Sequence, residues 1–332
     1  MDLKLAGKVV LITGSSRGIG LATAKAFAAE GCRLMLSARS AGPLAEAEAA
    51  LRASTADVAA HSADVSKHDE AAGLVQSAVA AFGGIDGLIN TVGGGGGGAR
   101  VADSTDDDWR SAMDRNLIQT VRMMRLALPH MKGRTGAAVI NVASISGWSP
   151  QLAMSGQYGA AKAALIFDTE RWALEFVPHG IRVNTVSPGS ILVAGNGWDR
   201  YRFANQEYFD DYVRHGFPMG RLGTAEEVAD VIAFLASPPI GLTAETYRSM
   251  VWNNPTLPSI GGHFSFGEAG MTQGGLQSVA PPTARLLADR NWPMRRMMSA
   301  RGAQRGNMSA PSIKKLSLTP SDRQSRPSAA GS

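Results

Sequence analysis

The chain has 332 residues, of which 44% are hydrophobic and 18% charged, so it can bury a large core and wholesale disorder is excluded. No apolar run reaches the roughly 20 residues that a membrane-spanning helix needs, and the single cysteine, Cys32, excludes a disulfide framework or a thiolate metal cluster. The net charge of +5 is uneven: residues 1–238 carry 22 Lys and Arg against 24 Asp and Glu, whereas residues 239–332 carry 11 against 4.

Short apolar runs alternate with longer helical patterns from residue 8 onward. The runs predict strands at Val9–Ile12, Arg33–Ser37, Ala59–Ala63, Gly87–Asn90, Ala138–Val142 and Arg182–Val186. The intervening segments predict helices at about 18–30, 43–53, 67–82, 105–131, 157–177 and 224–236. Most of the runs are continuously apolar, which is typical of strands covered by helices on both faces. The pattern predicts an α/β fold with a doubly wound parallel sheet of the Rossmann type.

The alternation stops at Ser237-Pro238-Pro239. The remaining segment holds nine of the 16 prolines and is rich in Arg, Ser, Gly and Ala. We therefore expect one dinucleotide-binding domain at 1–238 and an atypical, basic, poorly ordered tail at 239–332. The absence of a secretory pattern and the single cysteine favour a cytoplasmic protein.

A glycine-rich turn, Thr13 to Gly20 (TGSSRGIG), ends the first strand and opens the first helix. Glycines let the backbone approach a pyrophosphate, and the helix N-terminus offers free N–H groups to it. The residues expected to contact a dinucleotide here are Gly14, Ser16, Arg17, Gly18, Ile19 and Gly20. Two alternatives remain: a tight turn without a ligand, and a G-x-S-x-G nucleophile elbow. The position on the first strand disfavours the elbow.

The second strand indicates which cofactor is bound. It ends Leu36-Ser37-Ala38-Arg39, without the acidic residue that holds the ribose of NAD. Two arginines, Arg17 and Arg39, suit a 2′-phosphate because guanidinium groups form bidentate bonds to phosphate. The sequence favours NADP(H) over NAD(H).

Tyr158 and Lys162 lie four residues apart in a predicted helix and share one face of it. A nearby ammonium lowers the pKa of a tyrosine toward the working range of an acid–base catalyst. Ser144 ends the preceding strand, where its hydroxyl can bind a substrate oxygen. Asn116 lies within the predicted helix 105–131, where its amide can organise a water. This spacing alone is common and carries little weight.

Together these features closely resemble the short-chain dehydrogenase/reductase family over about residues 5–238, with members such as the 3-oxoacyl-[acyl-carrier-protein] reductases. Asn116, Ser144, Tyr158 and Lys162 match its catalytic tetrad. Further positions that resemble the cofactor contacts of the family are Asp64, Val65, Asn90, Gly93, Pro188, Gly189 and Ile191, together with Tyr158 and Lys162. Asn184 opens the N-x-x-x-P-G segment that contains two of them.

The resemblance implies hydride transfer between a nicotinamide and a carbonyl carbon. Tyr158 would give or take the proton, Ser144 would orient the oxygen, Lys162 would lower the pKa of Tyr158 and contact the nicotinamide ribose, and Asn116 would hold a water. It also implies a homodimer through the helices at 105–131 and 157–177. A cofactor-binding protein with impaired or no turnover is the alternative.

Three departures from the family pattern stand out. Gly93–Gly98 is a run of six glycines beside the expected nicotinamide site, which is either a mobile rim or a slack loop. Val193 replaces a threonine that often contacts the carboxamide. From Pro239 onward nothing matches the last strand of the family, so we expect an unpaired sheet edge and a doubtful tetramer. An altered reading frame or a replaced C-terminus is our hypothesis for this change.

The substrate is weakly encoded. Seven aromatic residues occupy positions 190–217, which cover the substrate in the family, but they can equally form a helix pair that merely packs. A small-molecule carbonyl or alcohol is expected, and a 3-oxoacyl thioester is the leading specific interpretation. Nucleic-acid binding by the tail is unlikely because the tail has no recognisable module. The six histidines show no metal-ligand spacing, so no metal is expected.

Overall fold

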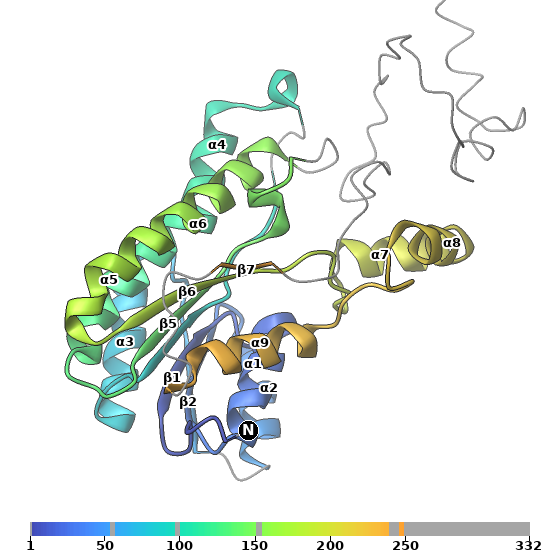
Figure 1. Cartoon of the computed structure of the whole chain (residues 1–332). Coiled ribbons are helices and arrows are strands. Elements are labelled where there is room, and N and C mark those ends of the chain that lie inside the picture. Colours follow the sequence, from blue (N-terminus) through green and yellow to red (C-terminus); the bar gives the residue numbers. More distant parts are fainter. Residues whose placement is uncertain (1, 54–56, 97–99, 151–154, 239–245, 249–332) are drawn as a thin grey trace, which may run out of the picture. The chain divides into compact units, whose positions relative to one another are not determined.

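Seven parallel strands form one sheet in the order β3-β2-β1-β4-β5-β6-β7 (Figure 1). The computed structural model describes residues 2–53, 57–96, 100–150, 155–238 and 246–248, which belong to a unit spanning Met1–Ser265. The strands are β1 Val9–Thr13, β2 Arg33–Ala38, β3 Val58–Ser62, β4 Gly87–Asn90, β5 Ala138–Val142, β6 Arg182–Ser187 and β7 Thr246–Arg248. The predicted doubly wound parallel sheet is confirmed.

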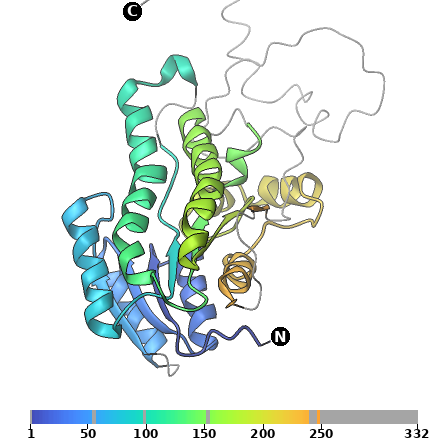
Figure 2. The same cartoon turned by 60° about the vertical axis from the view of Figure 1, so that its left-hand side comes forward.

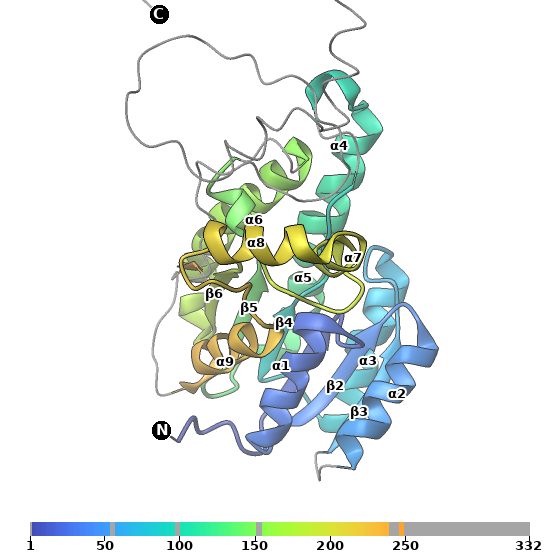
Figure 3. The same ribbon diagram turned by 90° about the vertical axis from the view of Figure 1, so that its right-hand side faces the viewer.

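Helices cover both faces of the sheet (Figures 1 and 3). One face carries α1 Gly18–Ala29, α2 Ala41–Arg52 and α9 Ala225–Ala236, and the other carries α3 His68–Phe82, α5 Gln119–Met131 and α6 Gly156–Phe176. Alternate side chains of each strand serve the two layers, since Val10 and Ile12 pack in the first core while Val9 and Leu11 pack in the second. This double burial explains the continuously apolar strands.

Two short helices, α7 Gly197–Ala204 and α8 Gln206–Gly216, follow β6. Figure 3 shows them beyond the carboxyl ends of the strands, on the side of the sheet where α1 and α9 lie. The helix α9 begins with a capping box, in which Thr224 and Glu227 satisfy each other's backbone N–H groups.

The strand order reverses between β1 and β4, and in open α/β sheets such a switch point is where a ligand crevice lies, at the carboxyl ends of the strands. Thr13, the last residue of β1, is in register with Ser37 of β2 and Asn90 of β4. The loops after all three strands therefore leave the sheet at one level. Open α/β sheets bind their ligands at such a switch point.

The predicted continuous helix at 105–131 is interrupted. It begins as α4 Asp106–Met113, passes through a π-helical turn at Asp114–Ile118, and continues as α5. The N–H of Gln119 bonds to the carbonyl of Asp114, five residues back, as π geometry requires. Figure 2 shows the interrupted helix running beside α6, and contacts join α6 to both α4 and the π turn. The π turn contains Asn116.

The sheet edge beyond β6 is paired, which corrects the expectation of an open edge. The strand β7 pairs in parallel with β6, with Thr246 in register with Thr185. Parallel ladders are held by main-chain hydrogen bonds, so a strand can form without the sequence motif that the family usually carries there. The predicted character of the tail itself lies outside the described residues, apart from β7.

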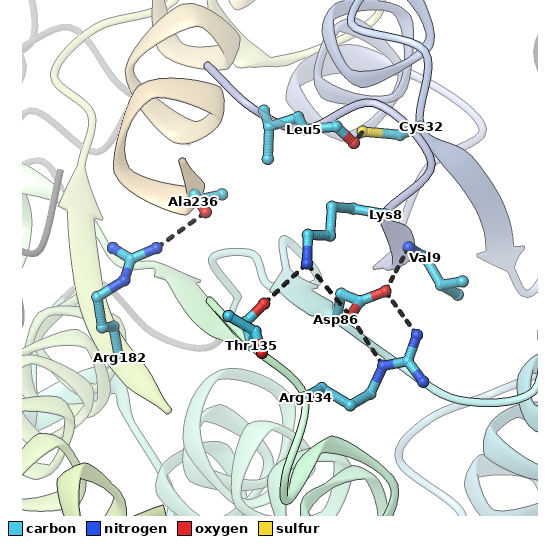
Figure 4. A network of polar contacts seen from close by, with 9 residues as sticks. All are labelled: Leu5, Lys8, Val9, Cys32, Asp86, Arg134, Thr135, Arg182 and Ala236. Atoms are coloured by element: carbon cyan, nitrogen blue, oxygen red, sulfur yellow. Dashed lines mark hydrogen bonds and ion pairs between the residues drawn. The ribbon is translucent and has the colours of Figure 1, made fainter. Parts of the chain in front are cut away.

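A polar network closes the amino end of the sheet (Figure 4). Buried Asp86 accepts hydrogen bonds of 2.8 Å from Arg134 Nε, Arg134 Nη2 and the N–H of Val9. Burial alone would raise the pKa of Asp86, but these bonds and the charges of Arg134 and Lys8 lower it. Nearby, Cys32 donates to the carbonyl of Leu5, and burial raises the pKa of its thiol to about 12.

Candidate active site

The glycine-rich turn between β1 and α1 is held by close backbone contacts. Gly14 and Gly18 have φ angles of +71° and +56°, which favour glycine. A Cβ atom at Gly20 would collide with the carbonyl of Gly14, and one at Gly14 would lie 2.8 Å from Thr91 Oγ1. The spacing of these three glycines is therefore required by the turn itself.

The N-terminus of α1 remains available to a ligand. Its N-cap residue, Arg17, is extended and its side chain does not bind the first N–H groups of the helix. Ser15 ties the turn to the end of β2, because its N–H donates to the carbonyl of Ser37 and its Oγ accepts from the N–H of Ser37. Ser16 and Ile19 are partly buried in the same turn.

Two buried oxygens beside this turn have no hydrogen-bond partner among the described residues. They are Ser37 Oγ, at the end of β2, and Asn90 Oδ1, at the end of β4. Buried polar atoms normally find a partner, so unpaired ones at the mouth of a crevice fit a ligand with donor groups. The uncapped helix N-terminus and the glycine turn are the features of this region that fit the phosphates of a dinucleotide.

Positive charge lies at the far side of the same crevice. Arg17 and Arg39 are both exposed, and Arg39 follows β2 directly. Burial alone would raise the pKa of Asp64, but bonds from Ser66 and the nearby charges of Arg39 and Lys67 lower it. Arg39 therefore lies close to the Asp64–Val65 segment, whose resemblance to the family implies a contact with the cofactor.

The predicted catalytic side chains come together where β5 meets α6. Ser144, just after β5, shares a hydrogen bond with the hydroxyl of Tyr158. Lys162 Nζ lies 5.9 Å from the centre of the Tyr158 ring and donates to the carbonyl of Val142 at 2.8 Å. Lys162 is 3% exposed. The four-residue spacing thus places both side chains of α6 against the end of one strand.

The pKa shifts of the two α6 residues are set by burial. Burial raises the pKa of Tyr158, while the hydrogen bond with Ser144 opposes this rise. Burial lowers the pKa of Lys162 to about 8. The expected lowering of the Tyr158 pKa by Lys162 is not seen in this structure, where burial sets the direction of the shift and the hydrogen bond with Ser144 opposes it.

Two glycines that the sequence analysis missed allow this contact. A Cβ at Gly147 would lie 2.8 Å from the backbone of Lys162, and one at Gly159 would lie 3.0 Å from the carbonyl of Ser146. The helix α6 thus packs directly on the backbone that follows Ser144. Both glycines stand close to the motif residues in sequence, but their requirement follows only from the packing.

Asn116 faces the loop after β4. Its Nδ2 donates to the carbonyls of Gly94 and Ala112 at 3.0 Å, and its Oδ1 accepts from the N–H of Gly94 at 2.9 Å. A Cβ at Gly93 would lie 2.8 Å from Asn116 Oδ1 and 2.9 Å from Lys162 Nζ. Gly93 therefore lies directly between two members of the predicted tetrad, and a larger residue at this position would displace one of them.

The part of the glycine run that the structure describes, residues 93–96, is held by hydrogen bonds to the π turn. Gly94 bonds to Asn116, and the carbonyl of Gly95 accepts from Arg115 Nη1 at 2.9 Å. Residues 97–99 lie outside the described residues. The part of the run at 93–96 is thus a bound segment, contrary to the interpretation as a slack loop.

The segment after β6 lies against the other parts of the crevice. The carbonyl of Pro188 accepts from the N–H of Ile145, next to Ser144. Ile191 is buried and bridges to Gly223, while Gly189 is partly buried. A Cβ at Gly18 would lie 3.1 Å from Val193, so the segment reaches back to the glycine turn.

The aromatic residues after β6 pack mainly on one another. Trp198 lies 6.3 Å from Phe209, 6.3 Å from Tyr212 and 5.9 Å from Phe217 between ring centres. Phe209, Tyr212 and Phe217 are buried, whereas Phe203 is 76% exposed. The cluster thus forms a small core for α7 and α8, so the alternative of a helix pair that packs describes most of these side chains.

Among the described residues, no helix is long and apolar enough to cross a membrane, and no three His, Cys, Asp or Glu side chains gather as a metal site would require.

Comparison with known proteins places these features in a family. Residues 14–246 match the family model described as enoyl-(acyl carrier protein) reductase. The human dehydrogenase/reductase SDR family member 4 is 31% identical over 243 residues, which cover 73% of this chain and 86% of that protein. A putative ketoacyl reductase of the monensin polyketide synthase from Streptomyces virginiae is 35% identical, over 69% of this chain and 90% of that protein.

Among solved structures, L-sorbose reductase from Gluconobacter frateurii, complexed with NADPH and L-sorbose, aligns with a TM-score of 0.71 and 31% identity. The alignment covers 77% of this chain and all of that one. The glycine turn, the crevice at the switch point, the Ser–Tyr–Lys arrangement and these similarities agree. The chain belongs to the short-chain dehydrogenase/reductase family of oxidoreductases.

Proposed function

We propose that this protein is an NADP(H)-dependent reductase that interconverts a carbonyl and a secondary alcohol with Tyr158 as the acid–base group. The observation that carries the proposal is the meeting of Tyr158 and Lys162 at the end of β5, where buried Lys162 Nζ lies 5.9 Å from the centre of the Tyr158 ring and Ser144 contacts the Tyr158 hydroxyl. This arrangement lies at the carboxyl end of the sheet, next to the glycine turn.

The side chains divide the chemistry between them. A bound nicotinamide supplies the hydride in the direction of reduction. The Tyr158 hydroxyl donates its proton to the substrate oxygen. Ser144 orients that oxygen and stabilises the charge that develops on it. Lys162 binds the nicotinamide ribose, and Asn116 holds a water that links Lys162 to solvent.

The preference for NADP(H) rests on charge. Arg17 and Arg39 are exposed at the side of the crevice where the adenine ribose would lie, and the end of β2 has no acid. A 2′-phosphate would gain bonds from both guanidinium groups, whereas the 2′-hydroxyl of NAD would lack its usual acidic partner. The NADPH complex of the sorbose reductase is consistent with this preference.

A 3-oxoacyl thioester is the substrate class that we propose. The matching family model and the polyketide relative both bear names from acyl-thioester chemistry. Exposed arginines near α7 and α8, such as Arg200 and Arg214, suit the phosphate of an acyl carrier.

A homodimer is proposed through α5 and α6. Phe167 and Leu174 lie two turns apart on α6 and are 69% and 76% exposed. A second copy would cover such an apolar stripe. Sedimentation of the double variant Phe167→Glu/Leu174→Glu should give a monomer where the parent gives a dimer; a dimer in both would remove α6 from the interface.

Oxidation of NADPH and NADH with a panel of ketones, ketoses and 3-oxoacyl thioesters tests the function. We expect turnover with NADPH, weak turnover with NADH, and the highest kcat/KM for a 3-oxoacyl thioester. Tight NADPH binding without turnover on any carbonyl would instead favour a protein that binds the cofactor only.

A further inference from the structure

A row of three side-chain donors runs along one face of the π turn and α5. The three residues, Arg115, Gln119 and Arg122, are spaced by four and three positions, so they lie on one side of the helix. Each donates to a main-chain carbonyl of a loop that leaves the carboxyl end of the sheet: Arg115 Nη1 to Gly95 at 2.9 Å, Gln119 Nε2 to Val92 at 2.7 Å, and Arg122 Nη1 to Val65 at 3.0 Å.

Gln119 is the central member of this row. It is 3% exposed, and its Nε2 also donates to the carbonyl of Arg115 at 2.6 Å. Both partners are carbonyl oxygens, so only the amino group of the side chain can face them. Gln119 thus joins the π turn that holds Asn116 to the loop that holds Gly93.

Position matters at that loop because Gly93 separates Asn116 from Lys162. A Cβ at Gly93 would be within 3 Å of polar atoms of both, so a small shift of the loop changes the space between them. The carbonyl that Arg122 binds belongs to Val65, at the other end of the crevice. The row therefore reaches both loops that border the expected cofactor.

We propose that Arg115, Gln119 and Arg122 are positioning residues that hold the loops after β3 and β4 in register with the catalytic groups. This inference rests on the proposed function and adds a division of labour. Gln119 and Arg115 fix the loop beside the nicotinamide, and so they affect the hydride step. Arg122 fixes the loop beside the adenine, and so it affects cofactor affinity.

Gln119→Glu is the decisive variant because it keeps the size of the side chain and replaces the donor group by an acceptor. The matched control is Gln76→Glu, the same change at an exposed glutamine of α3. We expect kcat to fall about tenfold or more in Gln119→Glu while the Kd of NADPH changes by less than about threefold. Amide hydrogen exchange in residues 91–96 should become faster, and the control should match the parent. Gln119→Met removes the donor group without adding a charge, and it should show the same fall in kcat and the same faster exchange as Gln119→Glu.

Arg122→Met should give the opposite split, with the KM for NADPH raised about fivefold to tenfold and kcat within about twofold of the parent. A Gln119 variant with parental kcat and parental exchange would overturn the proposal. A fall in kcat that only follows a lower folded fraction, measured by thermal unfolding, would also overturn it. If the parent itself turns over no carbonyl, the proposed function fails, and exchange and NADPH binding in the same variants still decide whether the row anchors the loops.

Discussion

The two ends of the parallel sheet are built on opposite principles. At the amino end, Asp86 is fully paired with Arg134 and the N–H of Val9, and Arg182 donates to the carbonyl of Ala236 at the end of α9 (Figure 4). Arg182 also donates to the carbonyl of Leu235. At the carboxyl end, buried oxygens of Ser37 and Asn90 lack partners among the described residues.

The pKa shifts of the titratable groups also differ between the two ends of the sheet. At the amino end, burial lowers the pKa of Arg182, but the Asp86–Arg134 pair is stabilised as ions. Burial alone would raise the pKa of Asp86, yet the hydrogen bonds from Arg134 and Val9 lower it, and the hydrogen bond to Asp86 raises the pKa of Arg134. At the carboxyl end, burial drives Tyr158 and Lys162 toward their neutral forms. Groups that are costly to bury and poorly paired mark a site that is shaped for chemistry rather than for stability.

The largest effect should come from Tyr158→Phe, which removes the proton donor and leaves the ring in place. We expect kcat to fall by about two to four orders of magnitude while NADPH still binds. Steady-state NADPH oxidation and a fluorescence titration measure the two quantities. Substantial turnover in this variant would remove Tyr158 from the mechanism.

The next effect concerns the phosphate of NADP. The double variant Arg17→Ala/Arg39→Ala loses two charge-assisted bonds, so the Kd of NADPH should rise about a hundredfold. The Kd of NADH in the same variant serves as the control and should change little. Equal losses for both cofactors would mean that these arginines do not recognise the 2′-phosphate.

Breaking the amino end should cost stability but not catalysis. Asp86→Asn should lower the free energy of unfolding by about 2 kcal/mol, less than a fully buried pair would lose, because Arg134 is partly exposed. The exposed pair of Asp57 and Arg33 supplies the control, and Asp57→Asn should cost less than about 1 kcal/mol. Urea unfolding measures both; equal losses would contradict the comparison.

The pH dependence of Asp86 has a definite sign. Its folded pKa is lowered, so its contribution is complete above the unfolded pKa of about 3.9 and is lost as the pH falls through the lower folded value. The difference in stability between the parent and Asp86→Asn should therefore shrink only at acid pH. A constant difference down to the acid transition would argue against this ion pair.

The smallest effect is the basic limb of the activity profile. The pKa of Lys162 is lowered to about 8, so its ammonium is lost as the pH rises through that value. Since kcat/KM reports the free enzyme, its value for NADPH should fall about tenfold per unit above pH 8. Stability moves the other way, because the cost of burying the charge disappears as Lys162 deprotonates. A flat profile to pH 10 would contradict a required ammonium.

Much of the fold could be predicted because its signals are local. The continuous apolar strands and the glycine turn each follow from sterics within a few residues, and Tyr158 and Lys162 share a face by helix geometry alone. The capping box of Thr224 and Glu227 was likewise predictable from four residues.

The remainder depends on tertiary contacts. The spacing of apolar residues in the sequence does not distinguish the π turn at Asn116 from an ordinary α-helix. The strand β7 has only three residues and contains no apolar run that would predict a strand. The pKa of Tyr158 was predicted in the wrong direction because the spacing in sequence gives the distance to Lys162 but not the loss of solvent. The polar spacing of Arg115, Gln119 and Arg122 was visible in the sequence, but the carbonyls that they bind were not.

The most direct test of the account is to follow the hydride itself. NADPH labelled with deuterium at the transferred position of C4 is incubated with the parent protein and the best carbonyl of the panel, and the product is analysed by mass spectrometry. The account predicts an alcohol that carries one deuterium on the carbinol carbon, with no such product from Tyr158→Phe. An unlabelled product, or no product from any carbonyl, would contradict the assignment of carbonyl reduction to the carboxyl end of this sheet.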